Sequence, residues 1–152
     1  MPGAVDIVCN VFTPQAVRKG YTGLDEHFKE QVRMPRAMRA GVTVAQYLRK
    51  MDRAGIERSL LIAARCGSLD VRGSFHLPYE MVAAICDRHP DRFSGLAGID
   101  PTLGVQGLRD LDRAVREYGF VGAHWYPHWF EMPPTAARVY PYYARCVELD
   151  IP

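Results

Sequence analysis

The feature that most constrains this chain is a fourfold alternation of short, apolar, β-prone runs with longer helical patterns. The runs predict strands at residues 4–12, 58–64, 94–99 and 120–126. The intervening helical patterns have the length of crossover connections, which are right-handed and leave the joined strands parallel. We therefore predict an α/β fold whose four strands lie parallel, in sequence order, with all their carboxyl ends at one edge.

The helix boundaries carry their own signals. Thr43 and Gln46 have the spacing of a capping box, and Gly55 fits the position just after the helix that they open. Further helices are predicted at 77–89, 105–118 and 136–150. In the last of these, Pro141 indicates either a kink or a helix that begins near Tyr140.

Two segments, residues 13–42 and 148–152, depart from this alternation of strands and helices. Residues 13–42 are punctuated by proline and glycine, with a possible helix only at 24–32. Such a long irregular segment is often a lid or binding loop, and a surface excursion or an oligomer contact is an equal alternative. Residues 148–152 resemble a helix end followed by the start of a fifth strand. We therefore expect residues 1–152 to be the first half of a larger single domain.

Composition excludes several classes of function. The formal net charge is only +2 and no basic run stands out, so neither nucleic acid nor a membrane surface is expected as a partner. No apolar run approaches the roughly 20 residues that span a bilayer, and the N-terminus lacks a signal-peptide pattern. The four cysteines are widely spaced and are expected to be reduced, buried thiols in a cytoplasmic protein.

Candidate functional residues gather where the predicted strands end. Because ligands of parallel α/β folds bind beyond the carboxyl ends of the strands, these positions are the place to look for chemistry. The candidates for catalysis are His124, His128 and Asp100, and those for substrate binding are Asn10, Arg65, Tyr126 and Trp129. A neutral imidazole can act as a general base near pH 7, and an arginine can clamp a carboxylate with two hydrogen bonds.

Each candidate also has a structural alternative. His124 is either substrate-facing or hydrogen-bonded inside the fold, and His128 is either catalytic or an ordinary loop histidine. Arg65 could equally form an ion pair, for example with Asp100. The large aromatic side chains most simply pack the core or a pocket wall: Trp125, Trp129 and Phe130. The remaining histidines are expected at the surface: His27, His76 and His89.

Four segments of this chain resemble the amidohydrolase-2 family. They are VDIVCNVFTP, TVAQYLRKMDRAGIERSLLIA, RHPDRFSGLAGIDP and the last 34 residues, from GFVGAHWYPHWF onward. This family comprises TIM-barrel metal-dependent hydrolases and decarboxylases related to aminocarboxymuconate-semialdehyde decarboxylase. The resemblance implies a (β/α)8 barrel of which about the first four βα units are present. It also implies a small-molecule substrate, and we expect a homo-oligomer for the full-length form.

The first strand departs from the family pattern. Family members usually carry Asp-x-His-x-His there, and the two histidines bind a divalent, zinc-like metal. Here the matching residues are Asp6, Val8 and Asn10. Valine has no donor atom and an asparagine amide is a poor ligand for zinc-like ions. We therefore assign no metal ligand in this chain and expect no such ion between residues 8 and 10.

Two hypotheses about function remain open. The first is an amidohydrolase-like hydrolase or decarboxylase that acts on a small carboxylate-bearing or cyclic substrate at the strand ends. The second is a non-catalytic relative that serves as a ligand-binding or partner subunit, which the loss of both first-strand histidines favours. The polar cluster at the strand ends favours the enzyme.

Overall fold

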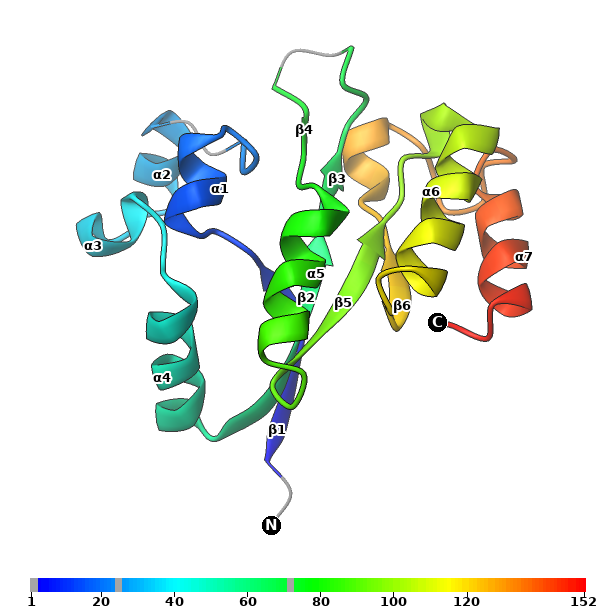
Figure 1. Ribbon diagram of the computed structural model, residues 1–152. Coiled ribbons are helices and arrows are strands. Elements are labelled where there is room, and N and C mark those ends of the chain that lie inside the picture. Colours follow the sequence, from blue (N-terminus) through cyan, green and yellow to red (C-terminus); the bar gives the residue numbers. More distant parts are fainter. Residues whose placement is uncertain (1–2, 24–25, 71–72) are drawn as a thin grey trace.

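Four parallel strands form a curled sheet in the order β1-β2-β5-β6. We determined this from a computed structural model that describes residues 3–23, 26–70 and 73–152. The strands are β1 (Ala4–Asn10), β2 (Ile56–Ala63), β5 (Phe93–Gly98) and β6 (Gly122–His124). Their parallel pairing and sequential order confirm the predicted topology. All four carboxyl ends meet at the upper edge in Figure 1, and we call this edge the mouth.

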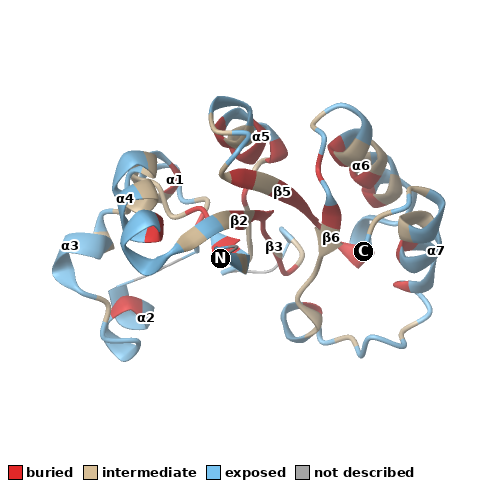
Figure 2. Ribbon diagram, turned by 90° about the horizontal axis from the view of Figure 1, so that it is seen from below, coloured by how far each residue is buried: buried red, intermediate tan, exposed pale blue. Residues whose placement is uncertain are grey.

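Helices cover one side of the sheet. Seen from below, they form an arc outside the strands, with their outer faces exposed (Figure 2). They are α4 (Val44–Ala54), α5 (Tyr79–Arg88), α6 (Val105–Arg116) and α7 (Tyr140–Glu148). The main core lies between them and the sheet, where Met51, Val82 and Leu111 are fully buried. The other side of the sheet is its concave side.

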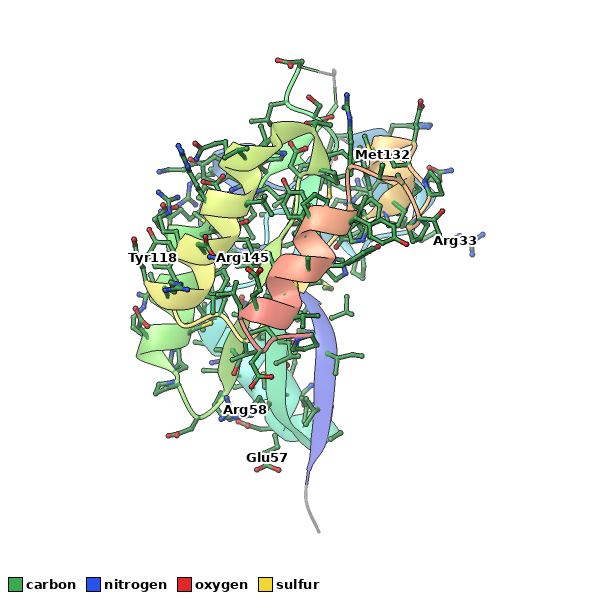
Figure 3. All side chains as sticks on the ribbon, turned by 90° about the vertical axis from the view of Figure 1, so that its right-hand side faces the viewer. Arg33, Glu57, Arg58, Tyr118, Met132 and Arg145 are labelled. Carbon is green, nitrogen blue, oxygen red and sulfur yellow. The ribbon has the colours of Figure 1, made fainter. Side chains whose placement is uncertain are left out.

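Helix ends follow the sequence signals. The Thr43 side chain accepts a hydrogen bond from the Gln46 backbone N–H, the Gln46 side chain returns one, and Gly55 closes α4 with φ 69°. Helix α7 begins at Tyr140 with Pro141 in its first turn, so the alternative of a late start is confirmed and that of a kink is not. Arg145 of α7 points to α6 and lies 2.7 Å from the Asp112 carboxylate (Figure 3).

The segment 13–42 holds three short helices. They are α1 (Pro14–Arg18), α2 (Glu26–Gln31) and α3 (Arg36–Arg39). The helix expected at 24–32 is thus α2, and residues 24 and 25 lie outside the described residues. In Figure 1 these helices stand above α4, on the mouth side of the fold.

Other connections at the mouth differ from the sequence prediction. A small antiparallel hairpin, β3 (Arg65–Cys66) with β4 (Phe75–His76), follows β2. Strand β6 ends at His124 rather than at Tyr126, and a 3-10 turn, η2 (Pro127–Phe130), follows it. Another 3-10 turn, η1 (Pro101–Leu103), follows β5. In the described part of the chain, no helix is both long and apolar enough to cross a membrane.

The end of the chain lies beside the last strand. The Ala123 backbone N–H donates to the Pro152 carbonyl at 2.9 Å, across the outer edge of β6. Residue 152 therefore lies next to the outer edge of β6, and residues 151–152 are not themselves in a strand. The outer edge of β1, at the other side of the sheet, has no strand beside it among the described residues.

Candidate functional site

The two outer strands of the sheet meet across the mouth. Asn10 ends β1, and Tyr126 follows β6 directly. The Tyr126 hydroxyl donates a long hydrogen bond, 3.5 Å, to the Asn10 side-chain oxygen Oδ1. Because β2 and β5 lie between these strands, the contact requires the sheet to curl strongly. Partial burial, and the nearby Cys66 thiol, raise the pKa of Tyr126, so its phenol is neutral and able to donate.

His124 lies directly against this pair. Its ring meets the Tyr126 ring edge to face, with 4.5 Å between the centroids. Its Nδ1 atom is buried and has no hydrogen-bond partner among the described residues. The alternative of an internally hydrogen-bonded histidine therefore does not hold for this nitrogen. Burial lowers the pKa of His124, which keeps the imidazole neutral near pH 7.

The rim of the mouth is aromatic. His128 and Trp129 belong to η2 and are both exposed. The His128 ring lies 5.9 Å from that of Tyr126, and Trp129 makes an edge contact with Phe75 of the hairpin. Trp129 therefore joins the rim to the hairpin. Trp125 and Phe130 pack against each other or the core, as the sequence predicts.

Arg65 and Asp100 lie in a second cluster, which we call the rear network. Its other members are His76, Tyr79 and Asp110. The Arg65 guanidinium stacks over the Tyr79 ring at 4.6 Å, and its Nη2 is 4.0 Å from an Asp110 carboxylate oxygen. The ion pair considered for Arg65 thus forms with Asp110 in α6 rather than with Asp100. Its side chain is largely buried and is held by residues of α5 and α6.

Asp100 has a structural role in the same network. It caps η1, because its Oδ1 accepts hydrogen bonds from the Thr102 backbone N–H and from the Thr102 hydroxyl. Its other oxygen lies 3.5 Å from His76 Nε2. The side chain is almost fully buried. Of the predicted site residues, Asn10, His124, Tyr126, His128 and Trp129 are therefore linked by contacts around Tyr126, whereas Arg65 and Asp100 lie at the same edge but in the rear network.

His76 is the member of the rear network that sequence reasoning missed. It was expected at the surface, yet its side chain is only 8% exposed. Arg65 Nη1 lies 2.7 Å from His76 Nδ1, and Nε2 is 3.0 Å from the Gly67 carbonyl. An arginine can only donate, so Nδ1 accepts and the imidazole is neutral. No sequence signal marked this residue, because strands of two residues have no readable period.

The donor set at the mouth does not fit a metal held by the first strand. Val8 has no donor atom, and the Oδ1 of Asn10 already accepts the Tyr126 hydroxyl. Within residues 3–23, 26–70 and 73–152, no three His, Cys, Asp or Glu side chains are grouped as metal ligands. No chemical step is therefore assigned to a metal here.

Solved structures share this fold. A 5-carboxyvanillate decarboxylase from Novosphingobium aromaticivorans, with bound manganese, superposes with a TM-score of 0.68 at 20% identity. The match covers 97% of this chain and 49% of the decarboxylase. A dihydroxybenzoic acid decarboxylase from Polaromonas sp., also with manganese, gives a TM-score of 0.63 at 22% identity, covering 100% and 48%. These likenesses establish the half-barrel: the described strands correspond to part of a TIM barrel.

Comparison with known sequences points to relatives of the same kind. A 2-keto-4-carboxy-3-hexenedioate hydratase from a Sphingobium strain is 31% identical over 80 residues, which are 47% of this chain and 24% of the hydratase. The chain thus spans about half the length of the similar structures, and its matched segment covers about a quarter of this relative. An amidohydrolase family model matches residues 23–152. With the curled parallel sheet and the family's sequence segments, this match means that the chain belongs to the amidohydrolase family.

Proposed function

We propose that this chain provides part of the active site of an amidohydrolase-family hydrolase, decarboxylase or hydratase. The observation that carries the proposal is the convergence of Asn10, His124 and Tyr126 at the mouth, where enzymes with parallel barrels bind their substrates. The substrate we infer is a small, planar, carboxylated molecule. The aromatic rim of His128 and Trp129 suits such a ring, and the similar proteins act on carboxylated aromatic or unsaturated acids.

The mouth residues suit acid–base chemistry. Loss of carbon dioxide from an aromatic carboxylate needs a proton on the ring carbon. The carbon–carboxylate bond then breaks and its electrons restore the ring. We assign delivery of that proton to His128, which is exposed on the rim. His124, neutral and without a partner on Nδ1, would instead orient the substrate or accept a proton from it.

The experiment is a substrate panel on the native protein. The panel contains 5-carboxyvanillate, dihydroxybenzoate and 2-keto-4-carboxy-3-hexenedioate, with product release followed by chromatography and carbon dioxide by a coupled assay. We expect turnover of at least one compound, a fall of roughly 10²-fold or more in kcat for His128→Gln, and no change for the exposed His27→Gln. Equal rates in both variants would remove His128 from the mechanism.

A second candidate function rests on Val8 and Asn10. The first strand carries neither histidine of the family pattern, which favours a non-catalytic relative that binds a ligand at the same mouth. The panel separates the two functions. Turnover supports the enzyme, whereas stoichiometric binding of one of these acids without turnover supports the binding subunit.

A further inference from the structure

Asn10 presents only one kind of hydrogen-bonding group to the mouth. The oxygen of an asparagine amide is its one acceptor, and it is also the atom through which the amide would ligate a metal. In this chain Oδ1 accepts the Tyr126 hydroxyl. The amide nitrogen, Nδ2, carries two donors, and no described residue accepts from it. Asn10 is exposed at the end of β1, so those donors are open to solvent and to a ligand.

The Tyr126 contact fixes which way the amide points. A neutral phenol donates its single proton to Oδ1, and the raised pKa of Tyr126 keeps that proton in place near pH 7. If the amide were turned over, Nδ2 would approach the phenol and the acceptor would face the mouth. The hydrogen bond therefore orients the donors outward, and Tyr126 is a positioning residue for Asn10.

The charge of Arg65 is held away from Asn10. The Arg65 guanidinium is held in the rear network by His76, Asp110 and the Tyr79 ring. His124, whose ring lies 4.5 Å from that of Tyr126, is kept neutral by burial. A ligand that reaches Asn10 thus meets the neutral donors of the amide, beside the His124 and Tyr126 rings.

From this arrangement we infer that Asn10, oriented by Tyr126, is a metal-independent binding site for an acceptor oxygen of the substrate, such as one oxygen of an aromatic carboxylate. The inference rests on the proposed function, in that it places the ligand at the same mouth. It adds what the first strand contributes: hydrogen-bond donation from an amide in place of metal coordination.

The test is equilibrium binding to the native protein after treatment with a chelator. Benzoate is the probe with an acceptor carboxylate, and benzylamine is the matched cation. We expect benzoate to bind, benzylamine not to bind, and added Mn²⁺ to leave the benzoate Kd unchanged. Asn10→Asp keeps the shape but replaces the donors with a negative charge, so it should weaken benzoate binding by about tenfold or more.

Two further variants define the geometry. Tyr126→Phe frees the amide to turn and should weaken benzoate binding by only about two- to fivefold. The exposed His27→Gln should leave it unchanged. The inference is overturned if benzoate does not bind, binds only with Mn²⁺, or binds equally well to Asn10→Asp. Benzoate binding with this pattern but no turnover of the substrate panel would uphold it while removing the proposed enzyme.

Discussion

His76 shows how one buried side chain can make a fold sensitive to acid. Burial lowers its pKa, the Arg65 charge lowers it further, and the Gly67 carbonyl, Asp100 and Asp110 only partly compensate. An unfolded histidine titrates near pH 6.5. Between that value and the lower pKa in the folded protein, the unfolded chain binds more protons, so stability rises with pH. The stability that neutral His76 contributes is therefore fully present above about pH 6.5 and is lost as the pH falls below that value.

We expect acidification to lower the free energy of unfolding more in the wild type than in His76→Gln. Urea unfolding of the native protein at about pH 7.5 and about pH 5.5 measures the difference. His27→Gln, at an exposed site, is the control and should follow the wild type. An identical pH dependence in wild type and His76→Gln would show that His76 does not supply the effect.

Gly98 is a residue where backbone strands approach too closely for any side chain. A Cβ atom there would lie 2.0 Å from the Ala63 carbonyl oxygen and 2.8 Å from the Arg65 backbone nitrogen. These are backbone atoms at the end of β2 and the start of the hairpin. Gly98→Ala should therefore destabilise the protein by about 1–3 kcal/mol, measured by urea unfolding. An unchanged midpoint would contradict the close approach.

Among the elements, α4 is the one whose boundaries depend most directly on a sequence signal. Thr43→Ala removes the side-chain acceptor for the Gln46 N–H and should cost about 1 kcal/mol of stability. Thr43→Ser keeps the hydroxyl and should restore most of that loss. Chemical denaturation of the two variants side by side is the measurement. An equal loss in both would assign the effect to the lost methyl group instead of the cap.

How far the elements could be predicted depends on their length and period. The four strands and α4 to α7 repeat apolar residues often enough to be recognised, and parallel crossovers then fix the sheet order. The hairpin β3–β4 has two residues in each strand, too few for alternation to be read. Trp125 and Tyr126 have high β propensity, so the sequence predicts that the last strand includes them. In the structure β6 ends at His124, and the Tyr126 hydroxyl contacts Asn10 instead.

The site could be predicted only as a set of strand ends. Parallel topology places Asn10, Arg65, Asp100 and Tyr126 at one edge, and the structure agrees. Parallel topology does not indicate on which side of that edge each side chain lies. Arg65 and Asp100 turn toward α6 and η1, where Asp110 and Thr102 hold them. Those partners are distant in sequence or lie in a turn, so only the folded chain reveals them.

At the scale of the whole sheet, the outer edge of β1 has no partner strand among the described residues. Part of the concave side is covered, because Ile62 and Ala64 are buried in a cluster with Phe75 and Tyr126. Apolar side chains remain exposed on β1 itself: Val5, Ile7 and Val8. An exposed apolar edge strand is a template for pairing with another chain.

We expect a polypeptide of these 152 residues to associate or aggregate. Sedimentation velocity measures this directly. Ile7→Lys, which places a charge on the edge, should shift the distribution toward monomer. Val147→Lys changes an even more exposed apolar residue on α7, away from the edge, and should have no such effect. A compact monomer that melts cooperatively without any substitution would show that the edge is tolerated.

The separation of the rear network from the mouth has a consequence for the evolution of this chain. The rear network joins β3, β4, η1 and α6, and it uses none of the mouth residues. Exposed positions such as 8 and 10 can therefore change at a cost to stability of about 0.5 kcal/mol or less. A lineage can lose its first-strand metal ligands by small, tolerated steps and still inherit a rigid barrel wall. New chemistry then arises by altering the lining of the mouth, with the framework that supports it unchanged.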